Sequence, residues 1–189
     1  MVLTNLLIMD SMQVENAVNN INNMKIYFKG VFYNKNIDFN ILDCHECFFI
    51  VNTITDITVF GHWVSFFIRN QHCYFFDSFG FSPNHYGSDI EKFYSDFRGY
   101  KTIVFNKPIQ SSFSYVCGAY AIVNSYYMYK GYSIRQICNL FSKNKKKNDA
   151  FIVNQLYRLV GLRLSCVPKF CTLSMFGISC KFFCNCNHE

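Results

Sequence analysis

The sequence predicts an α+β fold in which a small, mostly antiparallel β-sheet packs around a central buried helix. Short apolar segments bounded by turn residues dominate the first half of the chain, and helical patterns dominate the second half. Residues 117–129 contain no charged side chain, and a helix that is apolar on every side is normally buried in the middle of a domain. The chain has 189 residues, of which 51% are hydrophobic, and this favours a single domain over 1–189 with a substantial core.

The first third of the chain predicts one weak helix and then several strands. Residues 1–24 have a weak helical pattern, and short aromatic pieces from Lys25 to Ile41 alternate with turn residues. Further strands are expected at residues 47–53, 62–68 and 72–76. The last two strands are joined by a polar turn at residues 69–71, which is typical of an antiparallel hairpin. Asp77 then follows the second arm of this hairpin.

A helix is predicted at residues 88–97. Ser88 is its expected N-cap and Glu91 would complete a capping box. Gly99 lies just past the end of the helix, where glycine commonly stops one. A short strand at residues 102–105 follows.

The second half of the chain predicts three helices. The central helix begins at Cys117 and runs to about Lys130, where Gly131 breaks it. Two more helices are expected at residues 133–141 and 149–160. The segment between them is predicted to be a basic turn that carries Lys143, Lys145, Lys146 and Lys147.

Net charge and cysteine content limit the binding partners and the cellular compartment that we expect for this protein. The net charge of +6 permits binding to nucleic acid or another polyanion without requiring it. The sequence shows no secretory signal and no apolar stretch of membrane-spanning length. We therefore expect a soluble, intracellular and mostly reduced protein, acting as a monomer without a membrane partner.

Cys117 is the candidate nucleophile. It stands at the first turn of the central helix, before the small Gly118. The helix dipole and the unpaired N–H groups of a first turn favour a thiolate there. One buried cysteine among ten is the competing interpretation, so the catalytic one depends on partners elsewhere in the chain.

The predicted hairpin supplies those partners. His62 begins its first strand and Asp77 follows its second, fifteen residues later. If the strands pair across their turn, the two ends lie side by side. An acid in that position can orient an imidazole that acts as a base.

Acyl transfer also requires donors for the oxyanion of the tetrahedral intermediate. The backbone N–H of Cys117 is one candidate. Gln110, seven residues earlier in the preceding loop, supplies a side-chain amide as the second.

Several segments resemble the adenovirus protease (adenain) family of the Ulp1-like cysteine proteases. The segments GHWVSFF, CYFFDSFGFS and QSSFSYVCGAY resemble the family's histidine strand, acidic strand and Gln-x6-Cys-Gly segment. YFKGVFY and FFIVNT resemble its N-terminal part. The resemblance runs in order from about Tyr27 to Tyr129, and the family-like core is placed at about residues 27–160.

The resemblance implies a Cys-His-Asp triad with a glutamine in the oxyanion hole. His62 corresponds to the general base, Asp77 to its orienting acid, Gln110 to the oxyanion donor and Cys117 to the nucleophile. No cofactor is then required for the chemistry.

Two features separate this chain from adenain. Adenain carries glutamate where this chain has Asp77. Adenain is also activated by a peptide that forms a disulfide with a cysteine, whereas residues 88–109 contain none and Gly99 lies near that position. A disulfide-linked activating peptide is therefore not expected. DNA remains a possible activator, with Lys143, Lys145, Lys146 and Lys147 as its candidate contacts; a solvated turn is the competing interpretation.

The remaining cysteines give no assigned site. Cys44 and Cys47 have C-x2-C spacing, and the tail offers zinc-type ligands at Cys180, Cys184, Cys186 and His188. The tail lacks paired C-x2-C spacing, so no metal is predicted. The Cys- and Phe-rich tail, residues 165–189, has no functional assignment.

The resemblance thus implies a viral-type cysteine endopeptidase that cleaves capsid or core precursors during particle maturation. It also implies substrates with small residues, often Gly, beside the cut, and a location in the virion and the host nucleus. The alternatives are a deubiquitinase or ubiquitin-like-modifier protease of the same clan, and a catalytically inactive DNA-binding virion protein.

Overall fold

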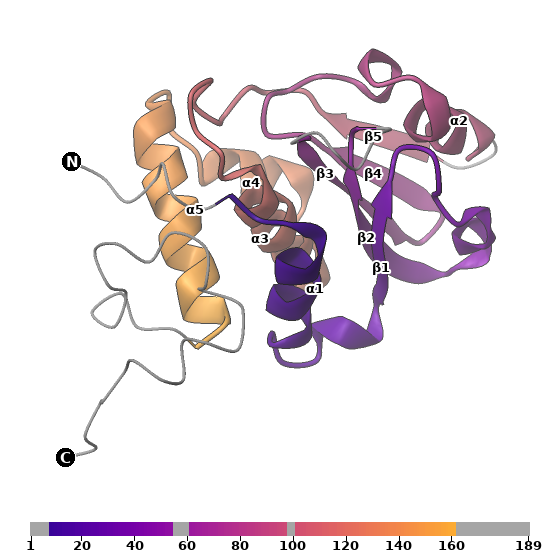
Figure 1. Ribbon diagram of the computed structural model, residues 1–189, viewed down its shortest axis with the longest axis horizontal. Coiled ribbons are helices and arrows are strands. Elements are labelled where there is room, and N and C mark those ends of the chain that lie inside the picture. The colour runs from indigo at the N-terminus through magenta and orange to yellow at the C-terminus, as the bar shows by residue number, and fades with distance from the viewer. Residues whose placement is uncertain (1–7, 55–60, 98–100, 162–189) are drawn as a thin grey trace.

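The computed structural model describes residues 8–54, 61–97 and 101–161, in which a five-stranded sheet carries helices on both faces (Figure 1). This confirms the predicted α+β class. The strands are β1 (Phe28–Tyr33), β2 (Glu46–Asn52), β3 (Trp63–Arg69), β4 (His72–Phe76) and β5 (Lys101–Phe105). The helices are α1 (Ser11–Asn19), α2 (Ser88–Asp96), α3 (Cys117–Tyr129), α4 (Ile134–Asn139) and α5 (Lys145–Leu159).

The strands lie in the sheet in chain order, from β1 to β5. The central strands β2, β3 and β4 pair antiparallel, as predicted. Both edge strands pair in parallel instead, β1 with β2 and β5 with β4. The sheet is therefore mixed, because the connections that lead out of β1 and into β5 are long enough to cross over rather than to turn back.

Strands β2 and β3 bury both of their faces, because their side chains alternate between two cores. In β2, Phe48 and Ile50 contribute to the core shared with α1, α3 and α5. Phe49 and Val51 contribute to a second core, on the side of the sheet that α2 covers. This accounts for the continuous apolar runs in the sequence, which are typical of strands covered on both faces.

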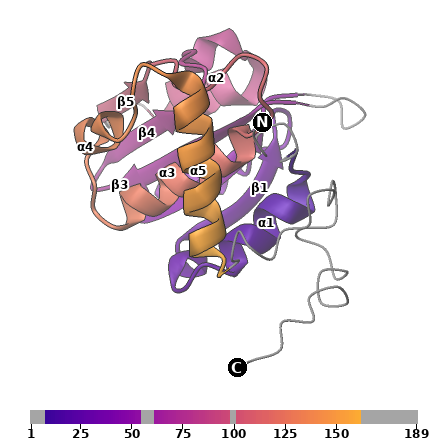
Figure 2. The ribbon, with the colours of Figure 1, turned by 90° about the vertical axis from the view of Figure 1, so that its left-hand side faces the viewer.

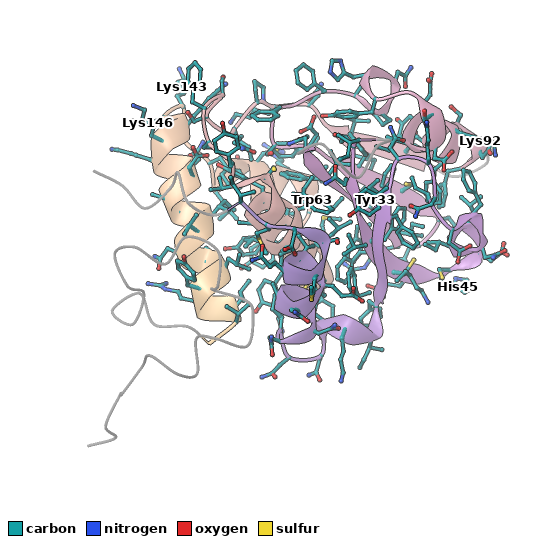
Figure 3. The ribbon with its side chains drawn as sticks, viewed as in Figure 1. Tyr33, His45, Trp63, Lys92, Lys143 and Lys146 are labelled. Carbon is teal, nitrogen blue, oxygen red and sulfur yellow. The ribbon has the colours of Figure 1, made fainter. Side chains whose placement is uncertain are left out.

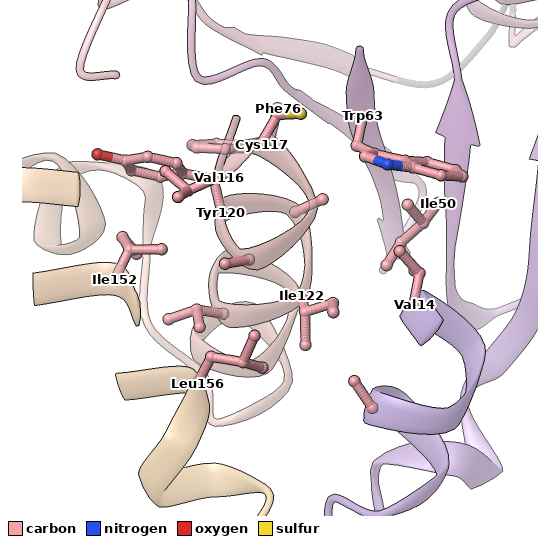
Figure 4. Packing of buried hydrophobic residues seen from close by; sticks show 14 of the residues in the cluster. Val14, Ile50, Trp63, Phe76, Val116, Cys117, Tyr120, Ile122, Ile152 and Leu156 are labelled. Atoms are coloured by element: carbon pink, nitrogen blue, oxygen red, sulfur yellow. The ribbon is translucent and has the colours of Figure 1, made fainter. Parts of the chain in front are cut away.

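The helix α3 is the centre of the larger core. It packs against β3 on one side and against α5 on the other, and Figure 2 shows α5 in front of α3 with the sheet behind. Ile122 of α3 and Ile152 and Leu156 of α5 are fully buried in this layer (Figure 4). Each such side chain contributes ~1.5–3 kcal/mol relative to exposure, so this packing holds α3 rigidly.

Two helix starts differ from the prediction. The N-cap of α2 is Gly87, and its first residue, Ser88, has a positive φ of 47° and forms no capping bond. The predicted capping box of Ser88 and Glu91 is thus wrong, because Ser88 lies inside the helix, one residue after the N-cap, and that cap is a glycine without a side chain. The predicted stop at Gly99 lies outside the described residues.

The prediction of a basic turn before the last helix is also wrong in part. Lys145, Lys146 and Lys147 form the first turn of α5, whose N-cap is Asn144. The Asn144 side chain accepts a hydrogen bond from the Lys147 N–H at 3.1 Å. This cap starts the helix four residues earlier than the charge pattern predicted.

Among the helices of the described ranges, none is long and apolar enough to cross a membrane.

Candidate active site

Four segments bring the predicted site residues to one edge of the sheet. His62 directly precedes β3 and Asp77 directly follows β4. In the hairpin Ser65 pairs with Phe76, so the start of β3 and the end of β4 lie at the same edge. Cys117 is the first residue of α3, and Gln110 lies in the loop between β5 and α3.

The ends of the hairpin meet as its topology predicts. The Nε2 atom of His62 lies 2.6 Å from the Oδ1 atom of Asp77, and Asp77 is fully buried. A charge-assisted bond of this length is strong, and the buried carboxylate fixes the orientation of the imidazole.

The turn after Asp77 is shaped around its carboxylate. Oδ1 also accepts a hydrogen bond from the Phe79 N–H at 2.8 Å. Oδ2 accepts one from the Phe81 N–H at 2.9 Å and one from the Tyr86 hydroxyl at 2.7 Å. Burial alone would raise the pKa of Asp77, but the bonds from His62, Phe79 and Tyr86 outweigh it and lower the pKa.

His62 is held as a cation at neutral pH. Burial lowers the pKa of its imidazole, but the bond to Asp77 and the nearby Cys117 side chain raise it by more, to about 9. Its ring also stacks on Phe79, with the ring centroids 4.5 Å apart. Since Asp77 occupies Nε2, the buried Nδ1 is the nitrogen that remains for the thiol, and it has no other hydrogen-bond partner among the described residues.

Cys117 stands at the tip of α3 (Figure 4), where its side chain is 8% exposed. Its N–H belongs to the first turn, where backbone donors lack partners within the helix. Gly118 leaves room for the neighbours of the thiol, because an added Cβ would lie 3.2 Å from Met9 Sδ and 3.3 Å from Trp63 Cδ1. The Trp63 indole in turn donates a hydrogen bond to the Met9 carbonyl at 2.9 Å, which closes the core below the site.

Gln110 is fully buried beside the acidic turn. Its Oε1 accepts a hydrogen bond from the Ser78 hydroxyl at 2.5 Å, and its Nε2 donates to the Ser114 carbonyl at 2.8 Å. Its own N–H donates to the Ser78 carbonyl at 3.0 Å. Ser78, the residue after Asp77, therefore fixes both the backbone and the side-chain amide of Gln110.

Gly80 completes the junction between the acidic turn and the glutamine loop. Its φ is +80°, and an added Cβ would lie 2.7 Å from the backbone nitrogen of Pro108. Only glycine suits both the conformation and the close approach. The two segments thus form one hydrogen-bonded and closely packed unit.

Sequence patterns missed two contributors to this site, Ser78 and Tyr86. A serine in a turn and a tyrosine in a loop carry no periodic or spacing signal. Their partners, Gln110 and Asp77, lie 32 and 9 residues away along the chain. Only the tertiary fold brings these groups together.

The four lysines proposed as DNA contacts lie just before α5 and in its first turn rather than among these residues. Lys143, Lys146 and Lys147 are exposed and Lys145 is half-buried, and Figure 3 shows Lys143 and Lys146 at the outer end of this helix. Nothing in their geometry identifies a ligand.

Within the described ranges, no three His, Cys, Asp or Glu side chains gather as metal ligands. Cys44 and Cys47 are free thiols near the start of β2. The tail cysteines 180, 184 and 186 and His188 lie outside these ranges.

Solved structures share this fold, and two of them illustrate the likeness. The ASFV pS273R protease superposes with a TM-score of 0.58 and 14% identity, over 85% of this chain and 69% of that one. ChlaDub1 from Chlamydia trachomatis superposes with a TM-score of 0.56 and 11% identity, over 85% of this chain and 94% of that one. No protein-family model and no curated protein matches the sequence. The chain therefore shares the fold of these two structures, while the likeness to the adenain family stays a prediction.

Proposed function

We propose that this chain is a cysteine endopeptidase in which Cys117 is the nucleophile and His62 the base. The observation that carries the proposal is the imidazole of His62, fixed by a fully buried Asp77 and placed beside a thiol at the head of a rigid helix. Nucleophile, base and orienting acid in this order are the requirements of covalent acyl transfer.

The first half of the reaction forms a thioester. At neutral pH His62 carries the proton, and its positive charge stabilises the thiolate of Cys117. The thiolate attacks the scissile carbonyl carbon, and the carbonyl oxygen becomes negative. His62 then gives its proton to the leaving amine as the C–N bond breaks.

The second half releases the product and restores the site. Water attacks the thioester while His62 takes one of its protons, and the carbon–sulfur bond breaks to free the carboxylic acid and the thiolate. Asp77 holds the imidazole in position through both steps.

The oxyanion of each step would be stabilised by the Cys117 N–H and the amide of Gln110. The Gln110 amide carries two hydrogens, and the Ser114 carbonyl accepts one of them. The second hydrogen is the one we assign to the oxyanion, with Ser78 holding the far side of the amide.

The proposed substrates are polypeptides with small residues beside the cut, and viral precursor proteins are the first candidates. The likeness in fold to the ASFV pS273R protease supports a polypeptide substrate. The likeness to ChlaDub1, of which this chain covers 94%, favours a second candidate, a protease for ubiquitin or ubiquitin-like modifiers. We assign the site of action to virion and nucleus only under the first.

The test compares variants on two substrates: a fluorogenic peptide ending in Gly-Gly before the cut, and a ubiquitin conjugate. We expect Cys117→Ala and His62→Ala to lose at least about 10³-fold in kcat/KM with their circular dichroism unchanged. Cys138→Ala, at a half-buried thiol on α4, is the control and should keep full activity. Wild-type turnover in either site variant would overturn the proposal.

The same assay separates the remaining possibilities. Preference for the peptide supports the endopeptidase, and preference for the conjugate supports the modifier protease. A chain that a thiol-directed acyl probe fails to label at Cys117 would instead be an inactive binding protein. Stimulation by DNA that weakens as salt rises would support an activator at the lysines of α5.

A further inference from the structure

Asp149 is a buried carboxylate that the proposed reaction does not use. It lies in the second turn of α5 and is 1% exposed. Among the described residues it forms no ion pair. Burial raises the pKa of this carboxyl, while hydrogen bonds from Ser114, Tyr120 and Ser111 and the positive charge of Lys145 oppose the rise. A buried acid with no cation in direct contact is costly, so its contacts indicate what it stabilises.

Those contacts lead to the glutamine loop. The Oδ1 atom of Asp149 accepts hydrogen bonds from the Ser111 N–H at 3.3 Å and from the Tyr120 hydroxyl at 3.0 Å. The Tyr120 hydroxyl also lies within hydrogen-bond distance, 3.3 Å, of the Ile109 carbonyl. Tyr120 belongs to α3, one turn after Cys117. The carboxylate therefore connects α5, α3 and the loop.

The neighbouring Asn148 holds the same loop from a second direction. It is buried, and its Nδ2 donates hydrogen bonds to the Ile109 carbonyl and the Ser142 carbonyl, both at 3.0 Å. Its Oδ1 accepts from the Ser142 N–H at 2.9 Å. Ile109 is the residue before Gln110 and Ser111 is the residue after it, so α5 holds the backbone on both sides of Gln110.

We propose that Asp149, assisted by Asn148, is a positioning residue that fixes the Gln110 loop and thereby the oxyanion-stabilising half of the site. The inference rests on the proposed function for its catalytic meaning. Asp149 touches neither the thiol nor the imidazole, and it acts through the backbone at Ile109 and Ser111.

This role predicts a separation between two reactions of the same thiol. Hydrolysis of a peptide passes through an oxyanion and needs the Gln110 amide in place. Alkylation of Cys117 by iodoacetamide forms a carbon–sulfur bond, expels iodide and develops no oxyanion. A loosened loop should therefore slow the first reaction and spare the second.

The experiment measures both reactions in Asp149→Ala and Asp149→Asn, with Ile152→Val as the control. We expect Asp149→Ala to lower kcat by about 10–100-fold with the alkylation rate of Cys117 within about twofold of wild type. Asp149→Asn keeps an acceptor oxygen and should recover most of the activity. Ile152→Val removes one buried methylene from the packing of α5 without touching the loop, and it should leave kcat nearly unchanged.

Amide hydrogen exchange gives a readout that does not depend on activity. In Asp149→Ala the amides of residues 109–114 should exchange at least about tenfold faster, and those of residues 77–81 should not. Wild-type kcat in Asp149→Ala, an equal loss of alkylation and hydrolysis, or unchanged exchange would each overturn the inference. If the wild-type protein hydrolyses neither substrate, the proposed function is contradicted. Faster amide exchange in Asp149→Ala would still support the positioning role in that case.

Discussion

The two flanks of Cys117 are built from different chemistry. On one flank His62 and Asp77 form a buried charged pair in which the carboxylate accepts four hydrogen bonds. On the other flank Gln110 is neutral. It lies in a loop that also contains Phe113 and Tyr115, whose side chains are 88% and 57% exposed. The first flank gets its precision from a strand hairpin, and the second gets it from hydrogen bonds between separate segments.

This difference indicates which flank tolerates change. A buried charge that loses its partner is penalised strongly, so the imidazole flank should fail as a unit. Neutral hydrogen bonds contribute about 1 kcal/mol each, so the glutamine flank should weaken in steps. Three predictions test the contrast, from the largest expected effect to the smallest.

The largest effect is expected from Asp77→Asn, which removes the negative charge and leaves the shape. We expect kcat to fall by about 10³–10⁴-fold, since the imidazole loses the partner that fixes its tautomer. The free energy of unfolding should fall by about 3–5 kcal/mol, and the pKa of His62 should fall with it. Enzyme assays, urea unfolding and an NMR titration of the imidazole measure the three effects.

A surface carboxylate supplies the control for that substitution. Asp96 forms an ion pair with Lys92, one helical turn away on α2, and both side chains are exposed. Asp96→Asn should leave activity unchanged and alter stability very little. Equal effects of the two substitutions would contradict the distinction between the flanks.

The second prediction is a loss of stability at alkaline pH that depends on His62. Because the pKa rises from 6.5 in the unfolded chain to about 9 in the folded one, the imidazole's contribution is fully present below pH 6.5. It is lost as the pH rises through 9, when the folded state also gives up the proton. The loss should amount to roughly 3 kcal/mol at most.

Urea unfolding of wild type and His62→Gln between pH 6 and pH 10 measures this loss. The wild type should lose its excess stability between pH 6.5 and 9, and the variant should show no such step. The lowered pKa of Asp77 acts at the acidic end, where its contribution falls only as the pH drops through that lowered value. Parallel curves for the two proteins would contradict the prediction.

The sequence predicts the imidazole flank much better than the glutamine flank. His62 and Asp77 follow from a hairpin with a short polar turn, a local pattern that also sets which strand ends meet. The bounds of α3 follow from a run without charge, because only burial accommodates such a helix. Both signals lie within about fifteen residues of sequence.

The hydrogen bonds that hold Gln110 and its loop have no comparable local signal in the sequence. Besides the local bond to Ser114, the contacts of Gln110 come from Ser78, 32 residues away, and its loop is held by Asp149, 38 residues from Ser111. The parallel pairing of β1 and β5 is equally non-local, because crossover connections decide it. The start of α5 is a different case, because its cap is local: Asn144 accepts from Lys147, three residues later, and the run of lysines hid this signal.

The smallest effect is expected at the junction of the flanks, as the extra cost of Gly80→Ala over Gly131→Ala. Gly80 and Gly131 have nearly equal φ angles, +80° and +85°, but an added Cβ meets Pro108 only at Gly80 and meets nothing within 4 Å at Gly131. Gly131→Ala should therefore cost about 1 kcal/mol for backbone strain alone. Gly80→Ala should cost about 1–3 kcal/mol more, since backbone must move. Urea unfolding measures the difference, and that excess reports how firmly the acidic turn is joined to the glutamine loop. If Gly80→Ala also lowers kcat while Gly131→Ala does not, the two flanks work as one unit; equal stability losses would mean that they are independent.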